Sequence, residues 1–114
     1  MKFDMTNVND IDNLITVIKT NGCSGIINCA GTTHKIPQPL QKLKCDGYEN
    51  VIDLHIVKTT YLIREVVKYA AETNSNFTFI QMASGLGLTS CPFTAVYAAS
   101  KAYLANMCRS LNAE

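Results

Sequence analysis

The stretch SGIINCAG, residues 24–31, combines a short apolar run with an ending of small residues. A run of this length, closed by alanine and glycine, is typical of a buried strand followed by a tight turn. A second segment, NFTFIQMAS (76–84), alternates in polarity and is rich in residues that favour strands. We therefore expect two buried strands that are far apart along the chain.

The residues before the first strand predict a helix. In NDIDNLITVIKTNG (9–22), apolar side chains recur at the spacing of one helical face, and Gly22 supplies a stop signal at the end. KFDMT (2–6) is interpreted as the end of a short strand. The apolar face of the helix consists of Ile11, Leu14, Ile15 and Ile18.

Two further helical patterns follow the first strand. The longer one runs from about Tyr48 to Glu72, and the other runs from Thr94 to about Ala113. TTHKIPQPLQKLKCDG (32–47) contains two prolines and is interpreted as a loop, in which His34 is expected to be solvated. GLGLTSCP (85–92) is a second loop. The apolar positions of the longer helix are Val51, Leu54, Leu62, Val66 and Tyr69.

Helices and strands thus alternate along the chain. Alternation of this kind predicts an α/β fold with a parallel sheet and right-handed crossovers. A chain of 114 residues is long enough for one domain and too short for two.

Composition excludes several classes of function. Hydrophobic residues make up 47% and charged residues 17% of the chain, as in a globular segment. The net charge is +1 and the basic residues are scattered, which argues against a nucleic-acid surface. MKFDMTNVND, at the start, lacks the apolar region of a signal peptide, and no apolar run is long enough to span a bilayer.

The five cysteines show neither an even count nor a C-x-x-C pair. This pattern supports neither a disulfide framework nor a zinc site. We expect reduced, buried thiols, and we assign no metal site.

Tyr97 and Lys101 carry the most specific chemistry in the chain. Residues four apart lie on the same face of a helix, so the phenol and the ammonium are expected side by side near the start of the last helix. A free phenol titrates near pH ~10, and a nearby ammonium stabilises the phenolate form. A tyrosine so placed can exchange a proton with a carbonyl or alcohol oxygen. The alternative is an ordinary exposed pair on an amphipathic helix.

The ends of the two predicted strands add candidate residues. Ser84 ends the second strand, and parallel sheets bind ligands at the carboxyl ends of their strands. Its hydroxyl could bond the same oxygen as Tyr97, or it could simply cap a turn. The first strand ends in NCAG (28–31), where small residues permit close approach of a ligand and Asn28 could brace the backbone.

Two other interpretations of these residues are weaker. GLGLTS (85–90) begins like a dinucleotide fingerprint but has serine at the third glycine position and follows the wrong strand. A hydrolase built on Ser84, His55 and Asp53 would need the elbow G-x-S-x-G, whereas MASGL surrounds Ser84.

NCAG, Ser84 at a strand end and YAASK (97–101) together resemble the short-chain dehydrogenase/reductase family. FDMTNVND (3–10) is similar to the family's D-V-T-D segment, and YENVIDLHIVKTTYLIREVV (48–67) is similar to its long central helix. The resemblance covers essentially the whole chain. It implies a doubly wound, Rossmann-like parallel sheet and hydride transfer between NAD or NADP and a carbonyl or alcohol.

The resemblance assigns roles to single residues. Tyr97 matches the acid/base, Lys101 matches the residue that tunes this tyrosine and holds the nicotinamide ribose, and Ser84 matches the residue that orients the substrate carbonyl. The cofactor-binding positions of the family correspond here to Asp4, near the adenine, to Asn28, Ala30 and Gly31, and to Tyr97 and Lys101 themselves.

The loop and helix from residue 83 to the end are most similar to the branch of steroid 17-beta-dehydrogenases and very-long-chain 3-oxoacyl-CoA reductases. This branch would imply a lipid or steroid substrate and a cytoplasmic or endoplasmic-reticulum location. The family also commonly dimerises through the two helices that match 48–72 and 94–113. A non-enzymatic interaction module that uses these helices is therefore the alternative function.

Two departures from the family pattern lead to further expectations. His55 stands where the family has an asparagine that supports a water relay, so we expect an impaired relay, although a ring nitrogen could still hold a water. The phosphate-binding segment T-G-x-x-x-G-x-G has no match in the sequence. We interpret residues 1–114 as a central fragment of a single domain that lacks the first strands and the C-terminal part. Such a fragment is expected to be inactive alone and marginally stable, because its sheet has an open apolar edge.

Overall fold

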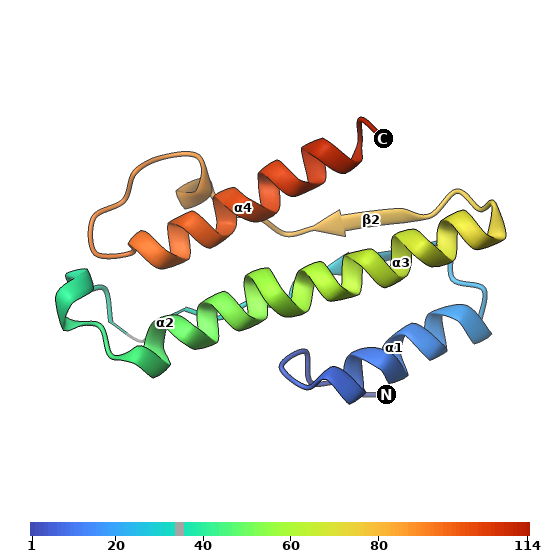
Figure 1. Ribbon diagram of the computed structural model, residues 1–114, viewed down its shortest axis with the longest axis horizontal. Helices are drawn as coiled ribbons and strands as arrows, with labels where there is room; N and C mark the ends of the chain where they lie inside the picture. The colour runs from blue at the N-terminus through green and yellow to red at the C-terminus, as the bar shows by residue number, and fades with distance from the viewer. Residues whose placement is uncertain (34–35) are drawn as a thin grey trace.

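The computed structural model describes residues 1–33 and 36–114, so the expectation for His34 lies outside the described residues. Helices and strands alternate along the chain, as predicted (Figure 1). The elements are α1 (Val8–Thr20), β1 (Gly25–Asn28), η1 (Leu40–Lys42), α2 (Cys45–Ile52), η2 (Asp53–Lys58), α3 (Thr59–Thr73), β2 (Thr78–Gln81), η3 (Gly85–Gly87) and α4 (Ala95–Leu111).

β1 and β2 form a two-stranded parallel sheet in which Gly25 pairs with Thr78 and Asn28 with Gln81. The connection between them is the long helical rod α2–η2–α3, which crosses over the sheet (Figure 1). This arrangement confirms the α/β fold and the parallel pairing. Because both strands end at the same edge, the segments that follow Asn28 and Gln81 begin side by side.

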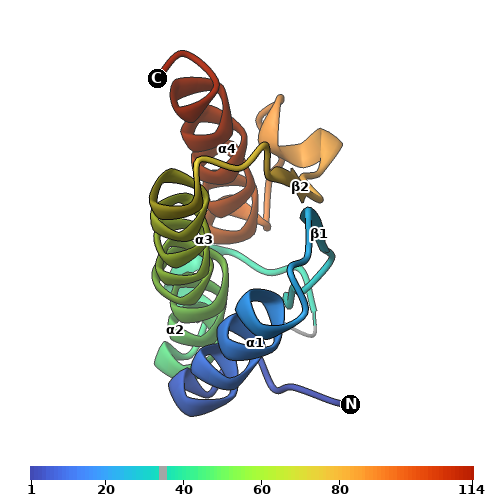
Figure 2. The ribbon, with the colours of Figure 1, turned by 90° about the vertical axis from the view of Figure 1, so that its right-hand side faces the viewer.

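The helices lie on one side of the sheet (Figure 2). Ile26 and Phe79 point to that side and pack against the apolar cluster of α1 and α3. Ile27 and Ile80, which are register partners, are 63% and 46% exposed. Parallel sheets are normally covered on both faces, so this chain leaves one apolar sheet face open.

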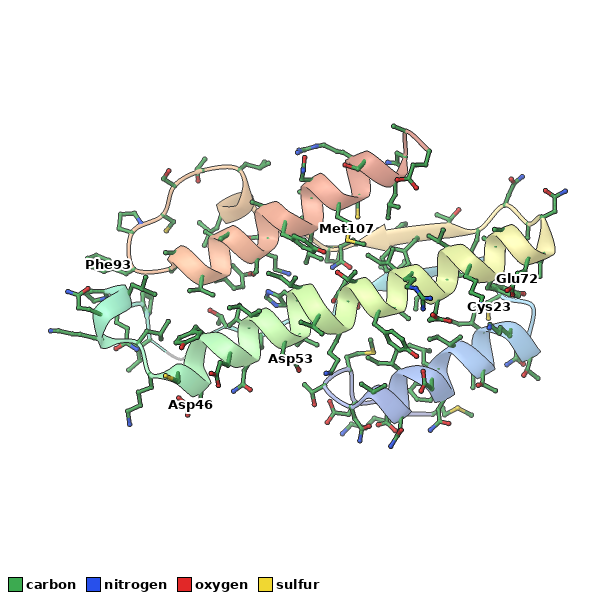
Figure 3. The ribbon with its side chains drawn as sticks, viewed as in Figure 1. Cys23, Asp46, Asp53, Glu72, Phe93 and Met107 are labelled. Atoms are coloured by element: carbon green, nitrogen blue, oxygen red, sulfur yellow. The ribbon has the colours of Figure 1, made fainter. Side chains whose placement is uncertain are left out.

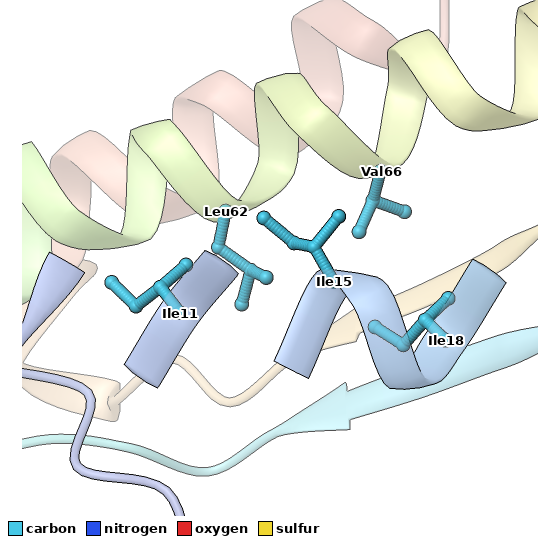
Figure 4. Packing of buried hydrophobic residues seen from close by; sticks show 5 residues of the cluster. All are labelled: Ile11, Ile15, Ile18, Leu62 and Val66. Atoms are coloured by element: carbon cyan, nitrogen blue, oxygen red, sulfur yellow. The ribbon is translucent and has the colours of Figure 1, made fainter. Parts of the chain in front are cut away.

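The main apolar cluster lies between α1 and α3 (Figure 4). The predicted face of the first helix supplies it, except that Leu14 is only partly buried beside it. α1 ends at Thr20, and Gly22 follows with a φ of 59° that favours glycine. The buried members of the cluster are Ile11, Ile15, Ile18, Leu62 and Val66.

The long helix contains a π-helical turn, η2, that bears His55. A π turn leaves backbone groups without their usual partner four residues along. Thr59 compensates, because its hydroxyl donates a hydrogen bond to the Leu54 carbonyl at 2.8 Å. The expected helix over 48–72 is thus confirmed, with an earlier start at Cys45 and a widened turn in its middle.

Residues 2–6 do not form the expected strand. The Asp4 carboxylate accepts hydrogen bonds from the backbone N–H and the hydroxyl of Thr6, and the Asp4 carbonyl accepts one from the N–H of Asn7. Asn7 then caps α1 through the N–H of Asn9. A strand needs a paired neighbour, and here local polar groups turn the chain into the helix instead.

Three smaller expectations need correction. The second strand ends at Gln81, so Ser84 lies beyond it, and both expected loops contain a short 3₁₀ turn. The cysteines are free thiols, but Cys29 and Cys45 are exposed and the other three are half-buried, so the expected burial was wrong.

Among the described residues, no helix is long and apolar enough to cross a membrane.

Candidate active site

The first turns of α4 place Tyr97 and Lys101 next to each other. The Lys101 Nζ atom lies 5.8 Å from the centroid of the Tyr97 ring, which confirms the expected proximity. Tyr97 is half-buried, whereas Lys101 is only 5% exposed. A buried ammonium beside a half-buried phenol is an arrangement that can support proton exchange with a carbonyl or alcohol oxygen.

The Lys101 ammonium is under-satisfied for its depth. Within the part of the chain that the structure describes, it donates one hydrogen bond, to the Met82 carbonyl at 3.3 Å. Burial lowers the pKa of Lys101. An ammonium has three N–H donors, so this group can donate to the hydroxyls of a bound ligand without giving up its protein contact.

The turn after β1 approaches Lys101 closely. A Cβ atom at Gly31 would lie 3.5 Å from the Lys101 Nζ atom and 3.2 Å from the Nε2 atom of His55. A side chain here would crowd the imidazole and touch the ammonium, so glycine lets the backbone approach both groups. The structure thereby joins NCAG to the Tyr97–Lys101 pair across a long separation in sequence.

Asn28 holds this turn in place. Its side-chain amide donates to the Gln81 Oε1 atom at 2.8 Å, and its Oδ1 atom accepts from the N–H of Ala30 at 3.1 Å. Asn28 is buried at the end of β1. The expected bracing of the backbone is therefore confirmed, and it fixes Ala30 and Gly31 beside the sheet edge.

His55 is fully buried against Tyr97, with ring centroids 5.7 Å apart in an edge-to-face arrangement. Its Nε2 atom accepts from the N–H of Thr32 at 2.9 Å, and its Nδ1 atom is 2.8 Å from the Ser100 Oγ atom. Both ring nitrogens thus have protein partners. The expectation that a ring nitrogen could hold a relay water is not met.

Ser84 lies in the turn that packs on α4. Its Oγ atom accepts from the N–H of Leu86 at 3.2 Å and so caps η3. This bond uses a lone pair, so the hydroxyl proton stays available to a ligand. A Cβ atom at Gly87 would lie only 2.8 Å from the Lys101 carbonyl carbon, which shows how closely η3 packs on α4.

Asp4 lies in the turn before α1, in the N-terminal segment, which lies apart from α4 (Figure 2). It is exposed, and hydrogen bonds from the backbone and then the hydroxyl of Thr6 lower its pKa. None of the contacts of the described residues connects Asp4 to Lys101 or Tyr97. A large ligand would have to span the sheet edge to reach both.

The alternative chemistries are not assembled. Asp53 pairs with Lys58, His55 bonds Thr32 and Ser100, and Ser84 caps η3, so the three hydrolase candidates do not form a triad. Over residues 1–33 and 36–114, no cluster of His, Cys, Asp and Glu could hold a metal ion.

Sequence reasoning missed Ser100, Thr32 and the Met82 carbonyl. Ser100 directly precedes Lys101, and a polar residue at a buried helical position was the available signal. Thr32 and Met82 act through their backbones, whose roles leave no trace in residue type.

Comparison with known proteins identifies the family. The family model described as "short chain dehydrogenase" matches residues 1–114. The chain belongs to this family. Its parallel strands and the helices beside them are therefore part of a Rossmann-like fold.

Several short-chain dehydrogenase relatives are curated proteins. The very-long-chain 3-oxoacyl-CoA reductases of Neurospora crassa and Ajellomyces capsulatus are 27% and 30% identical over the whole chain, which covers 34% and 33% of their lengths. A glucose 1-dehydrogenase of Gluconobacter oxydans is 27% identical over 97% of the chain, which covers 42% of its length. The chain thus spans about a third of the reductases it matches.

Solved structures of dehydrogenases have the same fold as this chain. A 4-hydroxyisoleucine dehydrogenase complexed with NADH and succinate is 31% identical, with a TM-score of 0.82, over 97% of this chain and 52% of that one. Serine dehydrogenase from Escherichia coli has a TM-score of 0.85 at 23% identity, over 99% of this chain and 52% of that one, and so supports the fold alone.

Proposed function

We propose that residues 1–114 carry the catalytic centre of an NAD(P)-dependent dehydrogenase or reductase that acts on a carbonyl or alcohol. The observation that carries this proposal is the buried Lys101 ammonium, which lies beside both the Tyr97 ring and the Gly31 backbone. Tyr97 would exchange the proton with the substrate oxygen, and Ser84 would orient that oxygen with its free hydroxyl proton.

The residues present fit the nicotinamide half of the cofactor. The N–H donors of Lys101 that bond no described residue suit ribose hydroxyls, and the turn at Ala30 and Gly31 offers a backbone surface without bulky side chains. When bound, NAD(H) or NADP(H) supplies or accepts the hydride. We place the adenine near Asp4. The phosphate-binding glycine segment is not among these 114 residues, and we propose that they form the central part of a single larger domain.

For the substrate, we propose a 3-oxoacyl thioester or its alcohol. The support is the name shared by the fungal reductases that match the entire chain. The elements for recognising a long acyl chain would come from outside these residues.

A chimaera tests the catalytic proposal. Residues 1–114 would replace the corresponding third of a fungal very-long-chain 3-oxoacyl-CoA reductase, and NADPH oxidation with a 3-oxoacyl-CoA would be measured. We expect turnover that Tyr97→Phe abolishes. Tyr103→Phe is the matched control, because Tyr103 lies on the same helix and bonds Thr60 instead. A chimaera that binds NADPH but loses no activity on Tyr97→Phe would refute the proposal.

For the isolated chain, we propose no turnover, because one half of the cofactor contacts is missing from it. The measurement is NADPH oxidation by the purified chain. Activity above that of its Tyr97→Phe variant would contradict this part of the proposal.

A non-enzymatic role through the two long helices is the second candidate. Val57 and Val67 on the central rod and Tyr103 on α4 are 52%, 46% and 38% exposed, so both helices offer apolar surface to a partner. We propose that these helices contact another short-chain dehydrogenase chain. Co-purification of the chain with a full-length reductase would support this contact if Val57→Lys abolishes it. A chain that is purified as a monomer without a partner would contradict the contact.

A further inference from the structure

His55 lies where three segments of the chain meet. It comes from the π-helical turn η2, it contacts Thr32 in the segment after β1, and it contacts Ser100 on α4. No part of the imidazole is exposed. Buried polar groups are normally hydrogen-bonded, and here protein groups bond both ring nitrogens.

The hydrogen inventory of these groups admits one arrangement. Ser100 has a single O–H, and it donates to the Tyr97 carbonyl at 2.7 Å. The Ser100 Oγ atom must therefore accept from the Nδ1 atom of His55, which carries the proton. The backbone N–H of Thr32 can only donate, so the Nε2 atom must be the bare acceptor. The ring is thus neutral, in the Nδ1–H tautomer.

The electrostatic surroundings agree with this neutral form. Burial, and then the charge of Lys101, lower the pKa of His55 to about 4. α4 presents Lys101 and Tyr97 to the ring, and the segment after β1 presents the backbone at Gly31 and Thr32. A proton on Nε2 would face both the Thr32 N–H and the Lys101 ammonium.

We propose that His55 is a positioning residue, whose Nδ1–H imidazole ties the Thr32 backbone to Ser100 and thereby sets the place of Tyr97 relative to the turn after β1. The contact acts on Tyr97 twice, through the hydrogen bond from Ser100 to its carbonyl and through the edge-to-face contact of the rings. This inference rests on the proposed role of Tyr97 as acid/base.

The first test needs no turnover. The chain has two histidines, so selective ¹⁵N-histidine labelling gives two ring systems, and His34→Gln assigns them. We expect the His55 ring of the full chain to show one protonated Nδ1 and one unprotonated Nε2 at neutral pH. A protonated Nε2, or averaging between tautomers, would overturn the proposal.

The second test breaks the bridge at Ser100. Ser100→Ala removes the acceptor of the Nδ1 proton, so the tautomer signature should be lost or averaged. Ser110→Ala is the matched control, because Ser110 likewise donates to a carbonyl of its own helix, that of Asn106, but on an exposed turn. An unchanged His55 spectrum in Ser100→Ala would count against the bridge.

The third test follows Thr32. Its amide should be protected from hydrogen exchange in the wild type, and protection should fall about tenfold in His55→Phe, the loss of one hydrogen bond. His55→Gln can offer an amide oxygen near the Nε2 position and should restore part of the protection at Thr32. If His55→Phe does not fold, the protection of each amide in His55→Gln is compared with that in the wild type instead. A loss of protection at Thr32 that is no larger than the loss in the rest of the chain refutes a specific link.

These outcomes separate the two proposals. If the catalytic chimaera is inert while the tautomer and the Thr32 protection are as expected, the proposed function fails and the bridge stands. If the chimaera works through Tyr97 while the ring titrates freely near neutral pH, the positioning role fails alone. In a working chimaera, Ser100→Ala should lower kcat while leaving the KM for NADPH nearly unchanged.

Discussion

The fully buried imidazole of His55 makes folding of this chain sensitive to acid. Its pKa is about 4 in the folded protein and about 6.5 when exposed in the unfolded chain, so the unfolded state binds a proton first as the pH falls. The stabilisation from the neutral ring is complete above about pH 6.5 and is lost progressively down to about pH 4.

We therefore expect the free energy of unfolding of the wild type to fall as the pH drops through this window. The fall should be larger than that of His55→Gln by about 2 kcal/mol. Urea titrations of both proteins at several pH values measure the difference, and the carboxylates, being common to both, cancel. Parallel pH dependences of the two proteins would show that His55 is not protonated on unfolding in this range.

At the scale of elements, η3 is locked onto α4 at one glycine. A Cβ atom at Gly87 would lie 2.8 Å from the Lys101 carbonyl carbon and 2.9 Å from the Ala102 nitrogen, and helix backbone cannot yield as a side chain can. We expect Gly87→Ala to destabilise the chain by about 2–3 kcal/mol and to displace Ser84 from α4. Gly85→Ala is the control, because a Cβ atom there meets nothing within 4 Å. Equal urea midpoints for the two variants would contradict the close docking.

The loop that leads into α4 holds a strained residue. Phe93 adopts a φ of 66°, which bulky residues rarely do, and its carbonyl accepts from the Gln38 N–H at the outer end of the molecule (Figure 3). Phe93→Gly would relieve this strain, but it would also remove the contacts of the ring and give the unfolded chain more conformational freedom. A net loss of stability in urea titration would mean that these two costs outweigh the strain.

At the scale of the whole molecule, the open sheet face decides how the chain behaves. Ile27 and Ile80 pair across the two strands and are both exposed, while the helices cover the opposite face only (Figure 2). We expect the purified chain to be marginally stable and to self-associate, because an uncovered parallel sheet attracts further apolar surface.

Ile27→Thr combined with Ile80→Thr should shift the chain toward monomer in analytical ultracentrifugation, since both residues keep a β-branched side chain and lose apolar area. Val8→Thr is the matched control, an exposed valine at the start of α1, away from the sheet. A wild-type chain that sediments as a monomer and unfolds in one cooperative step would contradict this prediction.

The sequence by itself determined the alternation of helices and strands, the buried face of α1 and the neighbourhood of Tyr97 and Lys101. Each of these follows from a local period: two residues in a strand, about 3.6 in a helix. The prediction of a strand at residues 2–6 was wrong. A strand forms only if it pairs with a distant segment, whereas the turn at Asp4 is made by hydrogen bonds between neighbouring residues.

Only the tertiary structure decided which distant groups meet. The crossover through α2–η2–α3 brings Gly31 and Thr32 to His55, and the docking of α4 brings Ser100 and Lys101 to the same point. The contact at Thr32 uses a backbone N–H group, the contact at Ser100 joins two side chains, and Gly31 contributes only backbone. Residue identity does not specify which distant partner each of these groups meets. The Tyr97–Lys101 pair could therefore be found from spacing, whereas its surroundings could not.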